Sequence, residues 1–180
     1  RLALRERTDA LGQAIDQLRD QFTETPPLLR FLPDVQVYHK AVDWALRHRL
    51  FFKEGAFKTA EELLAEGTER AKQLANGKTP WTRQPGLIVR GYISRLDGSV
   101  QPYGLVIPQS FSTDPWRKRR LDVWLHGRDN KLSELKFIQQ RRTSAGQFVP
   151  PDTIVLHPYG RFCNAFKFAG EVDVHEALGH

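Results

Sequence analysis

Two short apolar segments with a helical pattern between them constrain the fold of this chain most strongly. Residues 121–125 and 153–156 carry the β-branched and apolar side chains that are typical of buried strands, and residues 132–142 have helical spacing. Trp124, which stands among apolar neighbours, is expected in the core. A strand, a helix and a second strand in this order form a parallel pair joined by a crossover. The sequence therefore predicts a sheet with a parallel body and helices packed on it.

The segments on either side extend this sheet. Residues 87–94 have the composition of a strand, Asp97-Gly98 is a hairpin turn signal, and residues 100–107 are the expected antiparallel partner. The apolar spacing that begins at Phe168 predicts a second crossover helix. The predicted fold class is α/β, in which an antiparallel hairpin is followed by a βαβα segment of the same mixed sheet.

Residues 1–80 are predicted to be helical. Prolines at Pro26-Pro27 and a glycine at Gly77 mark helix ends. Three apolar stripes at helical spacing favour packing within a core over a surface for a partner. They are Leu4, Leu11, Ile15, Leu18 and Phe22; then Tyr38, Val42, Ala45 and Leu46; and then Ala60, Leu63, Leu64, Gly67, Ala71, Leu74 and Ala75.

Two helix starts in this part are predicted from capping residues. Asp34 is positioned as the N-cap of the second helix, because its carboxylate can accept from the first free backbone N–H groups. Thr59 and Glu62 form a capping-box pattern at the third helix. Composition then changes, so we divide the chain into a helical N-terminal region, residues 1–80, and an α/β region, residues 81–180.

The charge balance gives little support for a nucleic-acid or membrane partner. The net charge is +6, but the basic residues are scattered apart from clusters at residues 117–120 and 141–142. No known nucleic-acid-binding motif accompanies them, and no run of 18 apolar residues is present. The sequence begins with Arg1 and contains no methionine. We therefore expect a processed form or a fragment, and an export signal could have been removed upstream of it.

Three runs of residues resemble one family of enzymes. They are residues 91–104 (GYISRLDGSVQPYG), residues 121–128 (LDVWLHGR) and residues 157–167 (HPYGRFCNAFK). In this order they resemble the opening of an α/β-hydrolase fold, and specifically bacterial serine hydrolases of the prolyl-oligopeptidase family or of esterase type. The resemblance covers residues 86–180, about half of the chain, and the helical first part matches only as an N-terminal extension.

This resemblance implies a serine hydrolase that cleaves an ester or peptide bond through an acyl-enzyme. The family's nucleophile lies in a Gly-x-Ser-x-Gly elbow, followed by the acid and the histidine. The 180 residues contain no such motif. The chain would then supply the first half of the catalytic sheet, with the triad beyond His180 and the C-terminal half of the domain as its partner. No metal or organic cofactor is implied, and a secreted or periplasmic location is expected.

The resemblance also implies an oxyanion hole in the loop that follows the third strand. The backbone N–H of Arg128 is the expected donor, and Gly127 and Asp129 are the alternatives. Gly127 would permit the tight turn. The Arg128 side chain would contact the substrate or pair with Asp129. His126 is expected to form local hydrogen bonds that shape the loop, rather than to act as the base.

Further substrate-binding residues are expected after the fourth strand. Tyr159 could orient a substrate, and Arg161 could hold an anion with its two-pronged guanidinium. The alternative is that both belong to a loop buried under the rest of the domain. Asn164 is placed at the mouth of the pocket together with Lys167, and the alternative for both is a cap or a solvated position.

Three other patterns carry chemistry only superficially. Cys163 lacks the sequence surroundings of a catalytic thiol and is expected to be buried and inert. His175 and His180 are five residues apart, whereas two zinc ligands on one helix face are four apart, so no metal site is predicted. Ser133 and Lys136 fit Ser-x-x-Lys, but the partner motifs of that enzyme class are missing.

Two non-enzymatic alternatives remain open at the level of sequence. The α/β region could be a degenerate hydrolase that binds ligands or proteins without catalysis. The basic residues could instead form a module for a polyanion, in which case affinity would fall steeply with salt.

Overall fold

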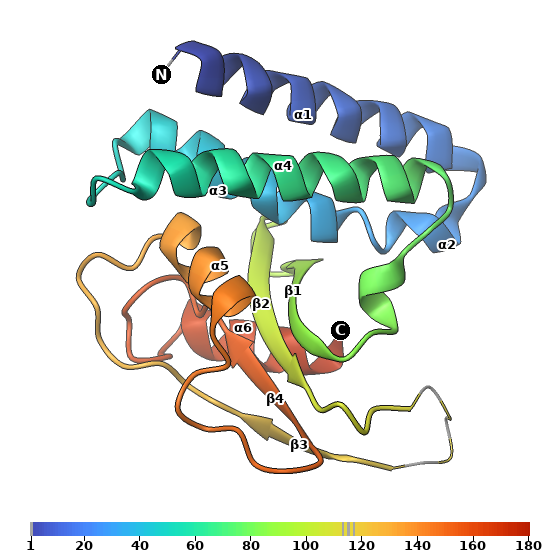
Figure 1. Cartoon of the computed structure of the whole chain (residues 1–180), viewed down its shortest axis with the longest axis vertical. Coiled ribbons are helices and arrows are strands. Elements are labelled where there is room, and N and C mark those ends of the chain that lie inside the picture. The colour runs from blue at the N-terminus through green and yellow to red at the C-terminus, as the bar shows by residue number, and fades with distance from the viewer. Residues whose placement is uncertain (1, 113, 115, 117) are drawn as a thin grey trace.

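The computed structural model describes residues 2–112, 114, 116 and 118–180, and in it helices pack on a mixed sheet (Figure 1). The predicted α/β class is confirmed at this level. The elements in chain order are α1 (Leu2–Gln21), η1 (Phe22–Glu24), α2 (Pro26–Leu29), α3 (Pro33–His48), α4 (Ala56–Ala75), η2 (Pro80–Thr82), β1 (Gly86–Ile93), β2 (Val100–Ile107), β3 (Arg120–Val123), α5 (Glu134–Thr143), β4 (Thr153–Pro158) and α6 (Ala169–Gly179).

The first half of the chain forms a helical layer, as its apolar stripes predict. Helices α1, α3 and α4 contact one another and lie together above the sheet (Figure 1). Most of their stripe residues are buried, among them Leu11, Tyr38 and Leu63, whereas Leu46 is partly buried and Ala75 is exposed. The close approach of α4 to α3 depends on Gly67, where a Cβ atom would lie 2.8 Å from Cβ of Tyr38. Burial of these stripes supplies most of what holds the helices in place.

Both predicted helix starts are wrong, for different reasons. The N-cap of α3 is Leu32, and Asp34 lies inside the helix with its carboxylate turned to Arg90 in the sheet. Helix α4 begins a turn earlier than Thr59, after Gly55, whose carbonyl accepts from the Thr59 N–H at 3.0 Å. In neither helix does the N-cap side chain bond to the backbone.

The four strands form a sheet in the order β1-β2-β4-β3. Strand β2 is antiparallel to both of its neighbours, and β3 is parallel to β4, with α5 in the connection between them. Gly104 of β2 stands opposite His157 of β4 in this register. Strand β3 lies at one edge of the sheet. Because β3 and β4 are parallel, their carboxyl ends lie at the same side of the sheet. The predicted site residues 126–129 follow the end of β3, and the predicted site residues Tyr159 and Arg161 follow the end of β4.

Helices cover the two faces of this sheet unequally. Helices α3 and α5 both contact β1 and β2, and the main core lies between them and the sheet. Helix α6 contacts β4, and a smaller cluster of Tyr92, Tyr103, Leu156 and Ala177 forms there. The main core includes residues of α1, α3, α4, β1, β2 and α5, so apolar packing is continuous from the helical region to the sheet.

One buried carboxylate joins the helical region to β1. Asp34 is fully buried and accepts from Arg90 Nε, from Trp81 Nε1 and from the Gly91 N–H, each at 2.8 Å. Gly91 makes this approach possible, because a Cβ atom there would lie 2.3 Å from the Pro33 carbonyl oxygen. The three donors satisfy an otherwise costly buried charge.

The end of β3 differs from expectation. The strand stops at Val123 and not at Leu125, although the Trp124 N–H still donates to the Leu156 carbonyl at 2.8 Å. Trp124 is not in the core as predicted, because it lies beyond the edge strand, where it is 38% exposed and stacks on Phe148. No helix in the described part of the chain has the length and apolar character needed to span a bilayer.

Candidate functional site

A cavity of about 280 Å³ lies where the loop after β3 meets α5 and β4. The loop contributes four consecutive residues to its lining, His126, Gly127, Arg128 and Asp129. The rest of the lining comes from Trp124, Leu132, Phe137, Gln140, Arg141, Gly146 and His157. The structure thus brings the four sequence-predicted loop residues together around one space.

His126 fixes the course of this loop. Its Nε2 atom lies 2.8 Å from the Tyr159 carbonyl, and its Nδ1 atom lies 3.0 Å from the Gly127 carbonyl. A carbonyl oxygen only accepts, so the shorter contact assigns an N–H to Nε2 and ties the loop after β3 to the loop after β4. The ring also packs edge-on against Phe166. These contacts place His126 where a loop-shaping residue is expected.

Arg128 has an exposed side chain, whose Nε donates to Asn130 Oδ1 at 3.2 Å. Of the two alternatives for this side chain, pairing with Asp129 is not the one found, because Lys136 holds that carboxylate and lowers the pKa of Asp129. Among the described residues, the backbone N–H groups of Gly127 and Arg128 have no hydrogen-bond partner. The Asp129 N–H is already bonded, which leaves the first two as the donors available to a ligand.

Cys163 holds the other end of the loop. Its Sγ atom accepts from the Asp129 N–H at 2.9 Å and donates to the Asp129 carbonyl at 3.0 Å. The thiol is only partly buried, so the expectation of full burial is wrong. No imidazole is among its hydrogen-bond partners in the part of the chain that the structure describes. The sulfur therefore links the loop after β4 to the loop after β3 by hydrogen bonds.

Tyr159 and Arg161 lie on a different cavity, of about 510 Å³, between α3 and the start of α5. Tyr159 is buried, and burial together with the nearby Glu134 carboxylate raises its pKa. Arg161 is paired with Asp97 and, through Nε, with Asp173 at 3.0 Å, so its guanidinium is occupied by the protein's own carboxylates. Hydrogen bonds from Arg161 to these carboxylates raise its pKa further.

Asn164 lies on neither of these two cavities. Its Oδ1 accepts from the Phe166 N–H at 2.9 Å, and its side chain fills the space beside Gly170, where a Cβ atom would lie 2.5 Å away. Lys167 is exposed. Asn164 therefore organises the loop before α6, as in the alternative considered from sequence.

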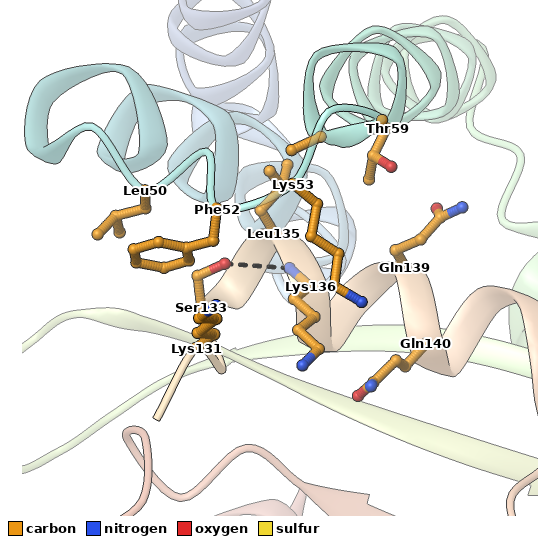
Figure 2. Close-up of a pocket in the computed structure, with 12 residues that line it drawn as sticks. Leu50, Phe52, Lys53, Thr59, Lys131, Ser133, Leu135, Lys136, Gln139 and Gln140 are labelled. Carbon is orange, nitrogen blue, oxygen red and sulfur yellow. Dashed lines mark hydrogen bonds between the residues drawn. The ribbon is translucent and has the colours of Figure 1, made fainter. Parts of the chain in front are cut away.

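The Ser-x-x-Lys pattern is a helix cap. Ser133 is the N-cap of α5, and its Oγ accepts from the Lys136 N–H at 3.2 Å, the dashed line in Figure 2. Figure 2 shows the Lys136 side chain extending away from Ser133 along a cavity of about 320 Å³ that Phe52 and Lys53 also line. The Lys136 ammonium pairs with Asp129 and is therefore not positioned as a base for the serine hydroxyl.

Arg141 and His157, which line the cavity of about 280 Å³, were not predicted as site residues from the sequence. His157 is 4% exposed, and its Nδ1 lies 2.9 Å from Arg141 Nη1. Burial, then the Arg141 charge and the charge of His126, lower the pKa of His157 to about 4. A strand-end histidine opposite a glycine was the available signal, because Gly104 leaves the space that the Arg141 stem fills.

We expect protonation of His157 to destabilise the fold. Its pKa rises from about 4 in the folded protein to about 6.5 in the unfolded chain. The unfolded state then binds more protons, so the free energy of unfolding falls as the pH drops from 6.5 towards 4. This histidine contributes up to about 3 kcal/mol to that fall. Urea titrations from pH 4 to pH 7 should show a steeper fall for the parent protein than for His157→Gln, and parallel curves would contradict the assignment.

The chain has no detected similarity to known proteins that would identify the site. The chain matches no family model, no curated protein and no solved structure. Within the residues that the structure describes, no group of three or more histidine, cysteine, aspartate or glutamate side chains could hold a metal ion. The geometry of the loop after β3 and of its cavity is therefore the basis on which we infer a function.

Proposed function

We propose that this chain is the N-terminal part of an α/β-hydrolase that cleaves an ester or a peptide bond through an acyl-serine. In this proposal the chain supplies the oxyanion-hole loop and a wall of the substrate pocket. The serine, the acid and the catalytic histidine belong to a further segment of the same catalytic domain.

The strand arrangement supports this proposal. In the order β1-β2-β4-β3, a hairpin leads into a parallel pair joined by α5. The edge strand β3 keeps one side unpaired within the described sheet, and Leu121 on it is 46% exposed. Further parallel strands could continue the sheet there and cover apolar surface.

The loop after β3 is the single observation that carries the proposal. Gly127 and Arg128 line a cavity, and their N–H groups have no hydrogen-bond partner among the described residues; hydrogen bonds of His126 and Asp129 hold the loop on both sides of them. Fixed backbone donors of this kind stabilise the negative charge that develops on the carbonyl oxygen during acyl transfer. Arg128 is the preferred donor, as in the sequence expectation.

The decisive experiment is reaction of the natural polypeptide with a fluorophosphonate, followed by mapping of the modified residue. A modified serine outside residues 1–180 supports the proposal. No modification of a protein shown to be folded would contradict it and would favour a non-catalytic binding protein.

Removal of the proposed donor should slow hydrolysis. Arg128→Pro deletes the N–H and should lower kcat/KM for an activated ester by about 10²–10³-fold. Arg128→Ala keeps the N–H and should lose much less. Equal losses in the two variants would exclude a backbone role for residue 128.

The polyanion alternative is less well supported by the structure. Many of the basic side chains are paired with carboxylates of the chain itself and do not form an open basic surface. The paired arginines include Arg5, Arg19, Arg47, Arg70, Arg90, Arg120, Arg142 and Arg161.

A further inference from the structure

Arg141 differs from three other arginines that are partly or fully buried, Arg70, Arg90 and Arg161. Arg70, Arg90 and Arg161 each form an ion pair with a carboxylate. Within the described residues, Arg141 forms no ion pair, and its side chain donates a hydrogen bond to the ring of His157. Burial without a compensating negative charge lowers its pKa. A guanidinium in this position leaves several N–H groups for a partner that the chain itself does not provide.

His157 adds a second unmet donor. Because the guanidinium only donates, Nδ1 of His157 must accept, and the neutral ring then carries its proton on Nε2. Nε2 is buried and has no hydrogen-bond partner among the described residues. An enclosed N–H without an acceptor costs free energy, so its retention calls for an explanation.

Arg141 and His157 are both among the residues that line the cavity of about 280 Å³ behind the loop after β3. The N–H groups of Gly127 and Arg128, which have no hydrogen-bond partner among the described residues, belong to residues of the same lining. Of the described lining residues, Asp129 alone carries a carboxylate, and Lys136 pairs with it. The cavity therefore combines several hydrogen-bond donors with an excess of positive charge.

We propose that this cavity binds a carboxylate group, held by the Arg141 guanidinium and by Nε2–H of His157. A carboxylate has two acceptor oxygens whose spacing suits a guanidinium, and charge-assisted hydrogen bonds of this kind are the strong ones. As a statement of substrate class, the inference rests on the proposed function: the hydrolase would act on substrates that carry a carboxylate near the scissile bond. The binding site itself does not depend on catalysis.

Titration with sodium butyrate, followed by NMR of ¹⁵N-histidine-labelled protein, tests this proposal. The neutral isostere butyramide serves as the comparison, at constant ionic strength and pH 7. Butyrate should shift the Nε2–H signal of His157 in a saturable way, and its Kd should be at least about tenfold lower than that of butyramide. Absence of a saturable shift in the parent protein overturns the proposal, whatever the variants do.

A matched pair of variants assigns the site. Arg141→Gln should weaken butyrate binding by at least about tenfold, because it removes the charged partner. Arg83→Gln makes the same charge change at an exposed arginine and should leave the Kd within about twofold. Equal weakening in both variants would overturn a specific site. If Arg141→Gln does not fold, His157→Gln takes its place, and butyrate binding to it and to the parent is then measured by isothermal titration calorimetry, because this variant lacks the reporting Nε2–H group.

The same titration tests which class of anion the cavity binds. Inorganic phosphate that shifts Nε2–H of His157 more strongly than butyrate would overturn the assignment to a carboxylate. Butyrate binding without fluorophosphonate modification would leave the carboxylate site standing while the hydrolase proposal fails. Fluorophosphonate modification without butyrate binding would support the hydrolase proposal and overturn the carboxylate site.

Discussion

Replacement of Asp34 by alanine is expected to lower the free energy of unfolding by about 3–5 kcal/mol. The variant leaves Arg90, whose side chain is 15% exposed, without its ion-pair partner. It also leaves the Trp81 and Gly91 N–H groups without acceptors in the buried joint between α3 and β1. Removal of one partner from a buried pair is more costly than loss of the pair's attraction alone, because the other charge stays buried. Urea denaturation monitored by tryptophan fluorescence measures the change.

Asp16 provides the matched control. It pairs with Arg19 on the surface of α1, and its side chain is 70% exposed. Asp16→Ala should change the free energy of unfolding by less than about 1 kcal/mol, because solvent screens an exposed pair. A loss in Asp34→Ala no larger than in Asp16→Ala would show that the joint does not hold the two regions together.

Replacement of Arg161 by glutamine is expected to lower stability by about 3 kcal/mol and to loosen the loop after β4. Asp173, whose side chain is 2% exposed, would lose its ion-pair partner. Burial already raises the pKa of Asp173 against the opposing effect of Arg161, so the variant should raise that pKa further. The same substitution removes the hydrogen bond from Arg161 to Ser94.

The loop depends on this network because its backbone is strained. Arg161, Phe162, Ala165, Phe166 and Phe168 all have positive φ, between 52° and 74°. Non-glycine residues in that region cost of order 1–3 kcal/mol each and persist only where surrounding contacts hold them. We therefore expect trypsin to cleave Arg161→Gln after Lys167 faster than it cleaves the parent protein.

Arg120→Gln is the control for Arg161→Gln. Arg120 pairs with Asp122 on β3, and its side chain is 69% exposed. The Arg120→Gln variant should keep both the urea midpoint and the rate of cleavage at Lys167 close to those of the parent protein. Matching cleavage rates in Arg161→Gln and the parent would refute the role of the network.

The regular elements were the part of the fold that sequence could predict. Apolar spacing located α1, α3 and α4, and Gly98, with a φ of 71°, forms the expected turn between β1 and β2. These features depend on local patterns of period and turn chemistry. The role of Asp34 was missed, because a carboxylate after a proline at a helix start fits a cap equally well, and Arg90 is distant in sequence.

The site was predictable only where it is local in sequence. The residues from His126 to Asp129 line one cavity together because they are consecutive. Arg161 was expected to hold a ligand, and only the folded arrangement brings Asp97 and Asp173 to it. Arg141 and His157 were missed for the same reason, since their contact joins a helix to a strand that follows it.

The joint at Asp34 has a consequence for synthesis on the ribosome. Arg90 follows Asp34 by 56 residues, and β1 covers a face of α3. At a synthesis rate of about 5–20 residues per second, roughly 3–11 s pass between synthesis of Asp34 and synthesis of Arg90 in β1. During that interval, a charged side chain and an apolar helix face stand open, so this is the period when the nascent chain most needs a chaperone.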